Sequence, residues 1–172
     1  MNQQTQIRSE DMLDEELFHE MTQHSNDVYK FVKLYNDYTN IARDYGTGEK
    51  VNMLSVHILS HIEEHPGITV TDLANQWYRT KGSISQVIKF LDEQGYIIKK
   101  KENNNEKNVH LYPSSRGLEL SLAHKLYDAK GLKDTLDFLT RSCSREELTA
   151  FYKVLNAYTR LFLEQRRDRE KD

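Results

Sequence analysis

The sequence has a single cysteine, Cys143, among 172 residues, so an intramolecular disulfide cannot form. Only two prolines and seven glycines interrupt regular structure. No apolar run approaches the roughly 18 residues of a membrane-spanning helix, and the N-terminus lacks the basic start and apolar run of a secretion signal. These absences predict a cytoplasmic protein without a membrane partner, built mainly from helices.

Recognisable catalytic motifs are absent as well. The chain has no nucleophile motif, no glycine-rich phosphate loop and no pair of carboxylates at a catalytic spacing. We therefore expect no enzymatic activity, no catalytic residue, no bound metal and no cofactor.

Negative charge exceeds positive charge over the whole chain, but one segment has an excess of basic residues. The formal net charge is −3, yet residues 79–107 hold seven basic residues against four acidic ones, which leaves −6 on the rest of the chain. A basic segment on an acidic body is typical of a local phosphate-binding face, although ordinary scatter can also give a difference of this size.

Long amphipathic helices are predicted at both ends of the chain. Apolar residues recur every three, four or seven positions across residues 10–45, until Gly46 and Gly48 end the pattern. Two more helices are predicted within residues 114–168, and the second opens with Ser144 and Glu147 at the spacing of a capping box.

The middle segment, residues 51–113, changes character. Short helices are predicted over residues 52–64, from a cap at Thr69, and over residues 81–94 with Gly95 as the stop. Two strands follow, residues 96–101 and 109–112, joined by a long polar tip. Three helices and a hairpin in this order predict a winged helix-turn-helix, a mainly α fold with a small β-hairpin wing (α+β).

The helix predicted over residues 81–94 is the candidate reader of DNA. Its buried face should be Ile84, Val87, Ile88 and Leu91, which leaves small and polar groups outside. Gln86 can bond adenine through two hydrogen bonds, and lysines can neutralise phosphates. A solvated helix face is the alternative, but the hairpin directly after it favours DNA. The candidate DNA-contacting residues are Arg79, Lys81, Ser83, Ser85, Gln86, Lys89, Lys101, Asn105 and Lys107.

Several short motifs of this segment occur together in one known family. They are Asp72-Leu73-Ala74, the run KGSISQVIKFL at residues 81–91, Gln94-Gly95-Tyr96-Ile97 and Ser114-Ser115-Arg116-Gly117. On these motifs residues 51–117 resemble the MarR family of bacterial regulators.

The resemblance implies a single domain over residues 1–172, with residues 10–45 and 114–168 as dimerisation helices and residues 51–113 as the DNA-binding lobe. It further implies a homodimer that represses transcription from a pseudo-palindromic operator, and a small-molecule effector bound near aromatic residues such as Tyr35 and Tyr38. The wing departs from the family pattern, because Asn105-Glu106-Lys107 stands where an aspartate and two arginines are typical. Minor-groove contacts could therefore be weaker, or could move to Lys99, Lys100 and Lys101.

Other readings stay open at this point. His57, His61 and His65 recur every four residues, a spacing that suits a metal-sensing regulator as well as an ordinary helix surface. Cys143 lies near Arg141, Arg145 and a helix start, which favours a redox-sensing thiolate, although a lone cysteine at a helix junction is usually inert. A helical protein-interaction module that uses a winged helix without DNA is the alternative from another class.

Overall fold

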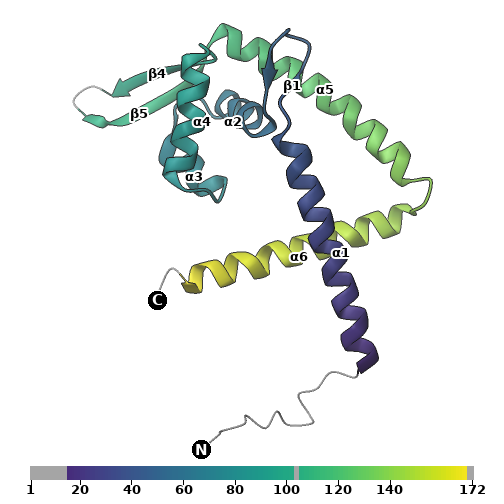
Figure 1. The fold of residues 1–172 in the computed structure, drawn as a ribbon. Coiled ribbons are helices and arrows are strands. Elements are labelled where there is room, and N and C mark those ends of the chain that lie inside the picture. Colours follow the sequence, from purple (N-terminus) through teal and green to yellow (C-terminus); the bar gives the residue numbers. More distant parts are fainter. Residues whose placement is uncertain (1–14, 103–104, 170–172) are drawn as a thin grey trace, which may run out of the picture. The chain divides into compact units, whose positions relative to one another are not determined.

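The computed structural model describes residues 15–102 and 105–169 (Figure 1). The chain divides between Ala123 and His124 into two compact units, each of which is considered by itself. The division falls within one long helix, so the first unit holds its beginning and the second unit its remainder.

The first unit contains every element of the predicted winged helix-turn-helix. Its elements in chain order are α1 (Glu15–Asn40), β1 (Arg43–Asp44), β2 (Lys50–Val51), α2 (Met53–Glu64), β3 (Ile68–Thr69), α3 (Val70–Gln76), α4 (Lys81–Glu93), β4 (Ile97–Glu102), β5 (Asn105–Pro113) and the start of α5 (Ser115–Leu139). The predicted fold class is confirmed: helices dominate, and the β-structure is small.

One hydrophobic core joins α2, α3, α4, β5 and α5. Ile58, Leu59 and Ile62 of α2 are fully buried, as their spacing on one helix face predicts. They share a core cluster with buried residues of the other elements, namely Leu73, Ala74, Ile84, Ile88, Leu91, Leu111 and Leu120. This burial fixes which side of α4 faces inward and therefore which side faces outward.

Side-chain caps set where the three short helices begin. Asn52 accepts a hydrogen bond from the backbone N–H of Ser55 at the start of α2. Thr69 and Asp72 form a complete capping box on α3, and the Thr80 hydroxyl accepts from the N–H of Ser83 on α4. Because each cap satisfies a helix-end N–H that has no partner within the helix, these starts were readable from the sequence.

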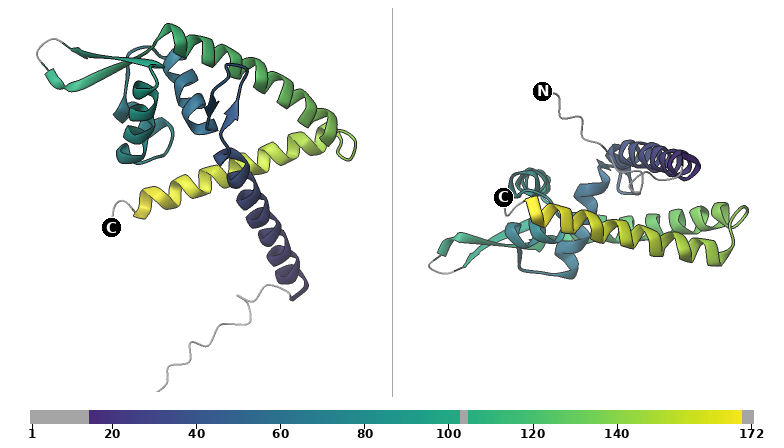
Figure 2. Two further views of the ribbon diagram at one scale, coloured as in Figure 1. Left: turned by 45° about the horizontal axis from the view of Figure 1, so that its top comes forward. Right: turned by 90° about the horizontal axis from the view of Figure 1, so that it is seen from below.

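The sheet is larger than the predicted hairpin. β4 and β5 pair antiparallel, from Ile97 opposite Pro113 to Glu102 opposite Asn105. The strands therefore extend into residues that were expected to form a long polar tip. β3 also adds to the other edge of β5, and β1 pairs with β2. Backbone pairing does not require apolar side chains, and strands of two residues have no readable period. Figure 2 shows the β4–β5 hairpin projecting beyond the helices of this unit.

The second unit consists of the remainder of α5 and of α6 (Arg145–Arg169), which diverge from the turn that joins them (Figure 2). The predicted capping box is present: Ser144 N–H donates to Glu147, and Glu147 N–H donates to the Ser144 hydroxyl. α6 has no fully buried residue. Within the described residues, no helix is both long and apolar enough to cross a membrane.

We expect Gly117→Ala to destabilise the first unit, because a Cβ at this position would collide with the carbonyl oxygen of Tyr96 and press on Leu59. Overpacking of a rigid backbone contact should lower the free energy of unfolding by about 3 kcal/mol. Urea denaturation measures this loss. Gly131→Ala in the same helix is the matched control, because a Cβ there meets nothing within 4 Å. It should stabilise the helix by roughly 0.5–1 kcal/mol. Equal effects of the two variants would contradict the close contact between residue 117 and the Tyr96 carbonyl.

Candidate nucleic-acid interface

The outward face of α4 is polar and continuous. Ile84, Ile88 and Leu91 are buried, whereas Val87 is only partly buried, short of the burial predicted from its spacing. Lys81, Ser85 and Lys89 are exposed at intervals of four, and Gly82 and Gln86 are exposed beside them. Residues three and four apart lie next to one another on a helix, so these five residues form one strip. Ser85 and Gln86 occupy its centre, where a helix inserted in the major groove presents hydrogen-bonding groups.

Two cations at the start of α4, one just before the helix and one in its first turn, are not neutralised by any carboxylate of the described residues. Arg79 and Lys81 are exposed, and among the described residues neither forms an ion pair. Ser83 is half-buried and its backbone N–H is occupied by the Thr80 cap, which leaves its hydroxyl at the edge of the strip. Phosphate oxygens are the natural partners of such a cluster.

Cations farther along α4 already have carboxylate neighbours. Lys89 lies 3.7 Å from Glu93, and Lys99 of β4 donates to Asp92 at 2.8 Å. Exposed ion pairs of this kind are worth little, so a phosphate can compete for either lysine. The positive potential of α4 is therefore strongest at its N-terminal end, the end that helix-turn-helix proteins direct toward the bases.

The wing places its lysines on two faces. Lys99 and Lys101 share one face of β4, while Lys100 lies on the other, with its Nζ 4.6 Å from the centre of the Tyr112 ring. Lys101 is exposed, and within residues 15–102 and 105–169 no ion pair holds it. Asn105 and Lys107 belong to β5, but their side chains lie outside the described part of the structure.

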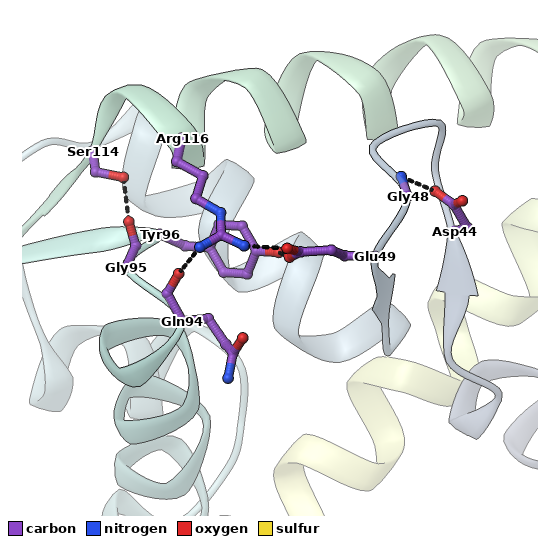
Figure 3. Close-up of polar contacts among 8 residues, drawn as sticks. All are labelled: Asp44, Gly48, Glu49, Gln94, Gly95, Tyr96, Ser114 and Arg116. Atoms are coloured by element: carbon purple, nitrogen blue, oxygen red, sulfur yellow. Dashed lines mark hydrogen bonds and ion pairs between the residues drawn. The ribbon is translucent and has the colours of Figure 1, made fainter.

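A polar cluster locks the junction of α4, the wing and α5 (Figure 3). Glu49 accepts a hydrogen bond from the Tyr96 hydroxyl and forms an ion pair with Arg116. Arg116 also donates to the carbonyl of Gln94, the C-terminal cap of α4, at 2.8 Å and lies over the Tyr96 ring. We call Glu49, Tyr96 and Arg116 the Glu49 clasp. The clasp fixes the end of α4 against the first turn of α5.

Further hydrogen bonds of Ser114 and Asp44 tighten the same junction. The Ser114 hydroxyl donates to the carbonyl of Gly95 at 2.6 Å and accepts from the N–H of Gly117 at 3.0 Å. Asp44 accepts three backbone N–H bonds, the nearest from Gly46 at 2.8 Å, and so closes the turn that presents Glu49. Helix, wing and turn are thereby held as one body.

The clasp perturbs the titration of its members. The hydrogen bond from Tyr96, and then the charge of Arg116, lower the pKa of the Glu49 carboxyl. Burial, together with the hydrogen bond to Glu49, raises the pKa of Tyr96 to about 12. Both shifts favour a carboxylate that accepts from a protonated phenol at neutral pH.

Glu49 and Arg116 were not among the site residues predicted from the sequence. Ser114-Ser115-Arg116-Gly117 was used only to identify the family, and Glu49 lies in a turn with no motif. The pairing joins residues 67 positions apart, so no local pattern could have revealed it.

The rival features have structural surroundings of their own. The rings of His61 and His65 stack with centroids 4.4 Å apart, and His57 and His61 both lie near Trp77, at 6.3 and 6.1 Å. His57 and His61 therefore pack against Trp77, with His65 stacked on His61, and the metal-sensing interpretation stays a prediction. Cys143 is a half-buried free thiol in the turn before α6, and its redox role stays a prediction.

Comparisons with known proteins support the resemblance stated from sequence. Residues 51–109 match the model of the MarR family. An uncharacterized HTH-type transcriptional regulator of Bacillus subtilis, YhjH, is 27% identical over 107 residues, which are 62% of this chain and 61% of that relative's length. The match to the MarR family is thus confirmed for the winged helix-turn-helix.

Solved structures share the fold. The MarR family transcription regulator SP03579 superposes with a TM-score of 0.68 at 23% identity, over 86% of this chain and 95% of that one. Streptococcus pneumoniae FabT, crystallised with DNA, gives a TM-score of 0.61 at 16% identity, over 86% and 98% of the two chains. At these identities the likeness establishes the architecture.

We expect the clasp to make stability depend on the charge of Glu49. The pKa of Glu49 is lowered from the usual 4.5 in the folded state. The carboxylate should therefore contribute fully to the free energy of unfolding above pH 4.5, and this contribution should be lost as the pH falls through the lowered pKa. Wild type should therefore exceed Glu49→Gln in stability at neutral pH, and the difference should shrink in acid. Urea denaturation at a series of pH values measures it.

Glu119→Gln, which removes an exposed carboxylate of α5 outside the clasp, controls for the loss of one negative charge. A Glu49→Gln difference that is the same in acid and at neutral pH would show that the carboxylate is not the stabilising species.

Proposed function

This chain carries the winged helix-turn-helix of the MarR family, and we propose that it is a sequence-specific DNA-binding transcriptional regulator that acts as a homodimer on a pseudo-palindromic operator. The observation that carries the proposal is the exposed polar strip of α4. The strip begins at Lys81, and neither Lys81 nor Arg79, just before the helix, is neutralised by a carboxylate of the described residues. A solvated face needs no such arrangement. A family member, FabT, has been crystallised with DNA.

The residues of the strip divide into two roles. Ser85 and Gln86 read base edges. The carboxamide of Gln86 matches the donor and the acceptor of adenine, and the hydroxyl of Ser85 can either donate or accept a hydrogen bond. Arg79, Lys81 and Lys89 neutralise phosphates, with Ser83 at the margin, and they position α4 without reading sequence. On the wing, Lys101 binds the phosphate backbone of the DNA, and Asn105 and Lys107 reach the minor groove.

The homodimer is supported by apolar side chains on the long helices. On α1, residues such as Phe31 and Tyr35 are 55% and 56% exposed, and on α6 Leu155 and Phe162 are 44% and 59% exposed. Stripes of this length are seldom left in water by a stable monomer. A second copy of the chain covers them, and its two-fold symmetry places two reading helices about one turn of DNA apart.

We further propose that the bound dimer blocks transcription and that a small molecule shifts it between states of different DNA affinity. Such an effector must bind the two states unequally, because equal binding shifts nothing. The aromatic residues of α1, Tyr35 and Tyr38 among them, suit an apolar effector. The family relatives are regulators, which agrees with a protein that performs no catalysis.

We predict that wild type selects a roughly two-fold symmetric sequence from a random duplex library and binds it in a salt-sensitive manner. The Ser85→Ala, Gln86→Ala double variant should lose about 10–100-fold in affinity for that duplex, because each good base contact is worth roughly 1–3 kcal/mol. It should keep its affinity for random DNA and its salt dependence, since the phosphate contacts persist. Fluorescence anisotropy at several salt concentrations measures all three quantities.

Ser142→Ala with Gln165→Ala is the matched control, because it makes the same two truncations at exposed positions of the second unit. If wild type enriched no sequence and ignored random duplex at low salt, the proposal would fail. A salt-insensitive protein interface would then be the better account of the winged helix.

We predict that Leu155→Glu with Phe162→Glu converts the dimer into monomers. Both residues are exposed in the single chain and lie seven positions apart on one face of α6, so dimerisation would bury two unpaired carboxylates. Analytical ultracentrifugation should show half the mass of wild type. Lys153→Glu with Arg160→Glu places carboxylates on another face of α6 and should leave the dimer intact. A dimer in the first variant would exclude this face as the contact.

A further inference from the structure

Arg116 lies in the first turn of α5 but contacts three other segments of the first unit. Its guanidinium donates to the carbonyl of Gln94 at 2.8 Å, forms an ion pair with Glu49, and lies 5.0 Å from the centre of the Tyr96 ring. These partners belong to the end of α4, the turn between β1 and β2, and the start of the wing (Figure 3). One side chain therefore ties together the segments from which α4 and the wing project.

The helix dipoles indicate which helix Arg116 serves. A cation in the first turn of α5 opposes the dipole of that helix. The same cation is favourable at the C-terminal end of α4, where Asp92 and Glu93 occupy the last turn and the carbonyl of Gln94 accepts from the guanidinium. Arg116 therefore supplies, from α5, positive charge at an end of α4 whose own charged residues are acidic.

Stability alone does not explain these contacts. The side chains of Arg116 and Glu49 are 49% and 44% exposed, and exposed ion pairs contribute little to the free energy of unfolding. The inward face of α4 is already fixed by the core. The wing, by contrast, is joined to α4 through only residues 94–96, and these are the residues that Arg116 contacts. What Arg116 constrains is the direction in which the wing leaves α4.

The direction of the wing determines where its lysines lie. Lys101 is four residues beyond Ile97, the first residue of β4, which is about 13 Å along the strand. A rotation of about 10° at the start of the wing would displace Lys101 by about 2 Å, enough to break a hydrogen bond. A wing that fluctuates would also have to be ordered on binding, at a cost in affinity.

We propose that Arg116 is a positioning residue for DNA binding, which holds the wing so that Lys101 and the strip of α4 bind one duplex in the same event. This inference rests on the proposed function and adds to it a residue that acts through Lys101. Arg116→Gln should therefore lose about as much affinity as Lys101→Ala, roughly fivefold. The loss should be the same on the selected duplex and on random duplex, because phosphate contacts read no sequence.

A direct phosphate contact by Arg116 is the alternative, and Glu49→Gln separates the two roles. If Arg116 positions the wing, a weaker partner at residue 49 lowers the affinity for DNA. If Arg116 binds a phosphate, the same change frees its guanidinium and raises the affinity. Glu119→Gln, at an exposed carboxylate of α5 outside the clasp, controls for the loss of one negative charge.

A double-mutant cycle tests the positioning role, with fluorescence anisotropy on the duplex that wild type selects. Lys101→Ala should lower the affinity of wild type about fivefold, but that of Arg116→Gln by less than about twofold, because the wing no longer brings Lys101 to its phosphate. Lys81→Ala is the matched control. Lys81 is placed by the core side of α4 rather than by the wing, so its loss should cost the same factor in both backgrounds.

Two further variants exclude a purely structural effect. Arg116→Lys keeps the charge but lacks the planar fork that bridges Gln94 and Glu49, so it should give the same cycle as Arg116→Gln. The cycle repeated in Glu49→Gln should also show a reduced Lys101→Ala factor, without any change in α5. Urea denaturation establishes that each variant is folded under the binding conditions, and the Glu49→Gln cycle decides the question if Arg116→Gln is not.

Equal Lys101→Ala factors in wild type and in the clasp variants would overturn the proposal. A higher affinity of Glu49→Gln than of Glu119→Gln would also overturn it, in favour of a direct phosphate contact. An Arg116→Lys cycle identical to that of wild type would show that charge alone suffices and that no bridge positions the wing. Wild type that bound neither duplex would refute the proposed function, and this inference with it.

Discussion

The burial of Tyr96 is the constraint on which the winged helix depends. Its carbonyl accepts from the N–H of Ser114 and lies so close to residue 117 that only glycine fits there. Its hydroxyl reaches Glu49, and its ring lies beneath Arg116. Tyr96, in the turn between α4 and β4, therefore sets the direction of α4, the origin of the wing and the start of α5. Because all three share one anchor, the strip of α4 and the lysines of β4 keep a fixed relation.

The charges at both ends of α4 oppose the helix dipole. Lys81 lies in the first turn and Asp92 and Glu93 in the last, so each charge opposes the helix dipole at a cost of roughly 0.3–1 kcal/mol. Lys99 offsets part of this at Asp92. The burial of residues such as Ile84 outweighs these costs. A chain selected for stability alone would reverse these charges, whereas the proposed phosphate contact of Lys81 requires the cation where it stands.

Local chemistry explains what the sequence could predict. Thr69, Thr80 and Ser144 begin helices because a cap needs only its own side chain and the next turn, and Ile58, Leu59 and Ile62 reveal the core through their spacing. Strand β3 and the Glu49 clasp join distant residues, so neither could be read locally. The strained φ of Tyr78 was also hidden, because the sequence places a tyrosine where the turn geometry favours glycine.

Assembly and DNA binding should be linked through the long helices. α6 has no fully buried residue, and the described side chains of α1 are almost all exposed, so neither helix gains from the single chain the burial that normally stabilises a helix of this length. In the proposed dimer this burial comes from the partner, and the stability of the protein then rises with its concentration. A monomer would engage one half-site with one reading helix. Dissociation would therefore weaken the grip on DNA even if every residue of α4 were intact, because the second half-site would no longer be bound in the same event.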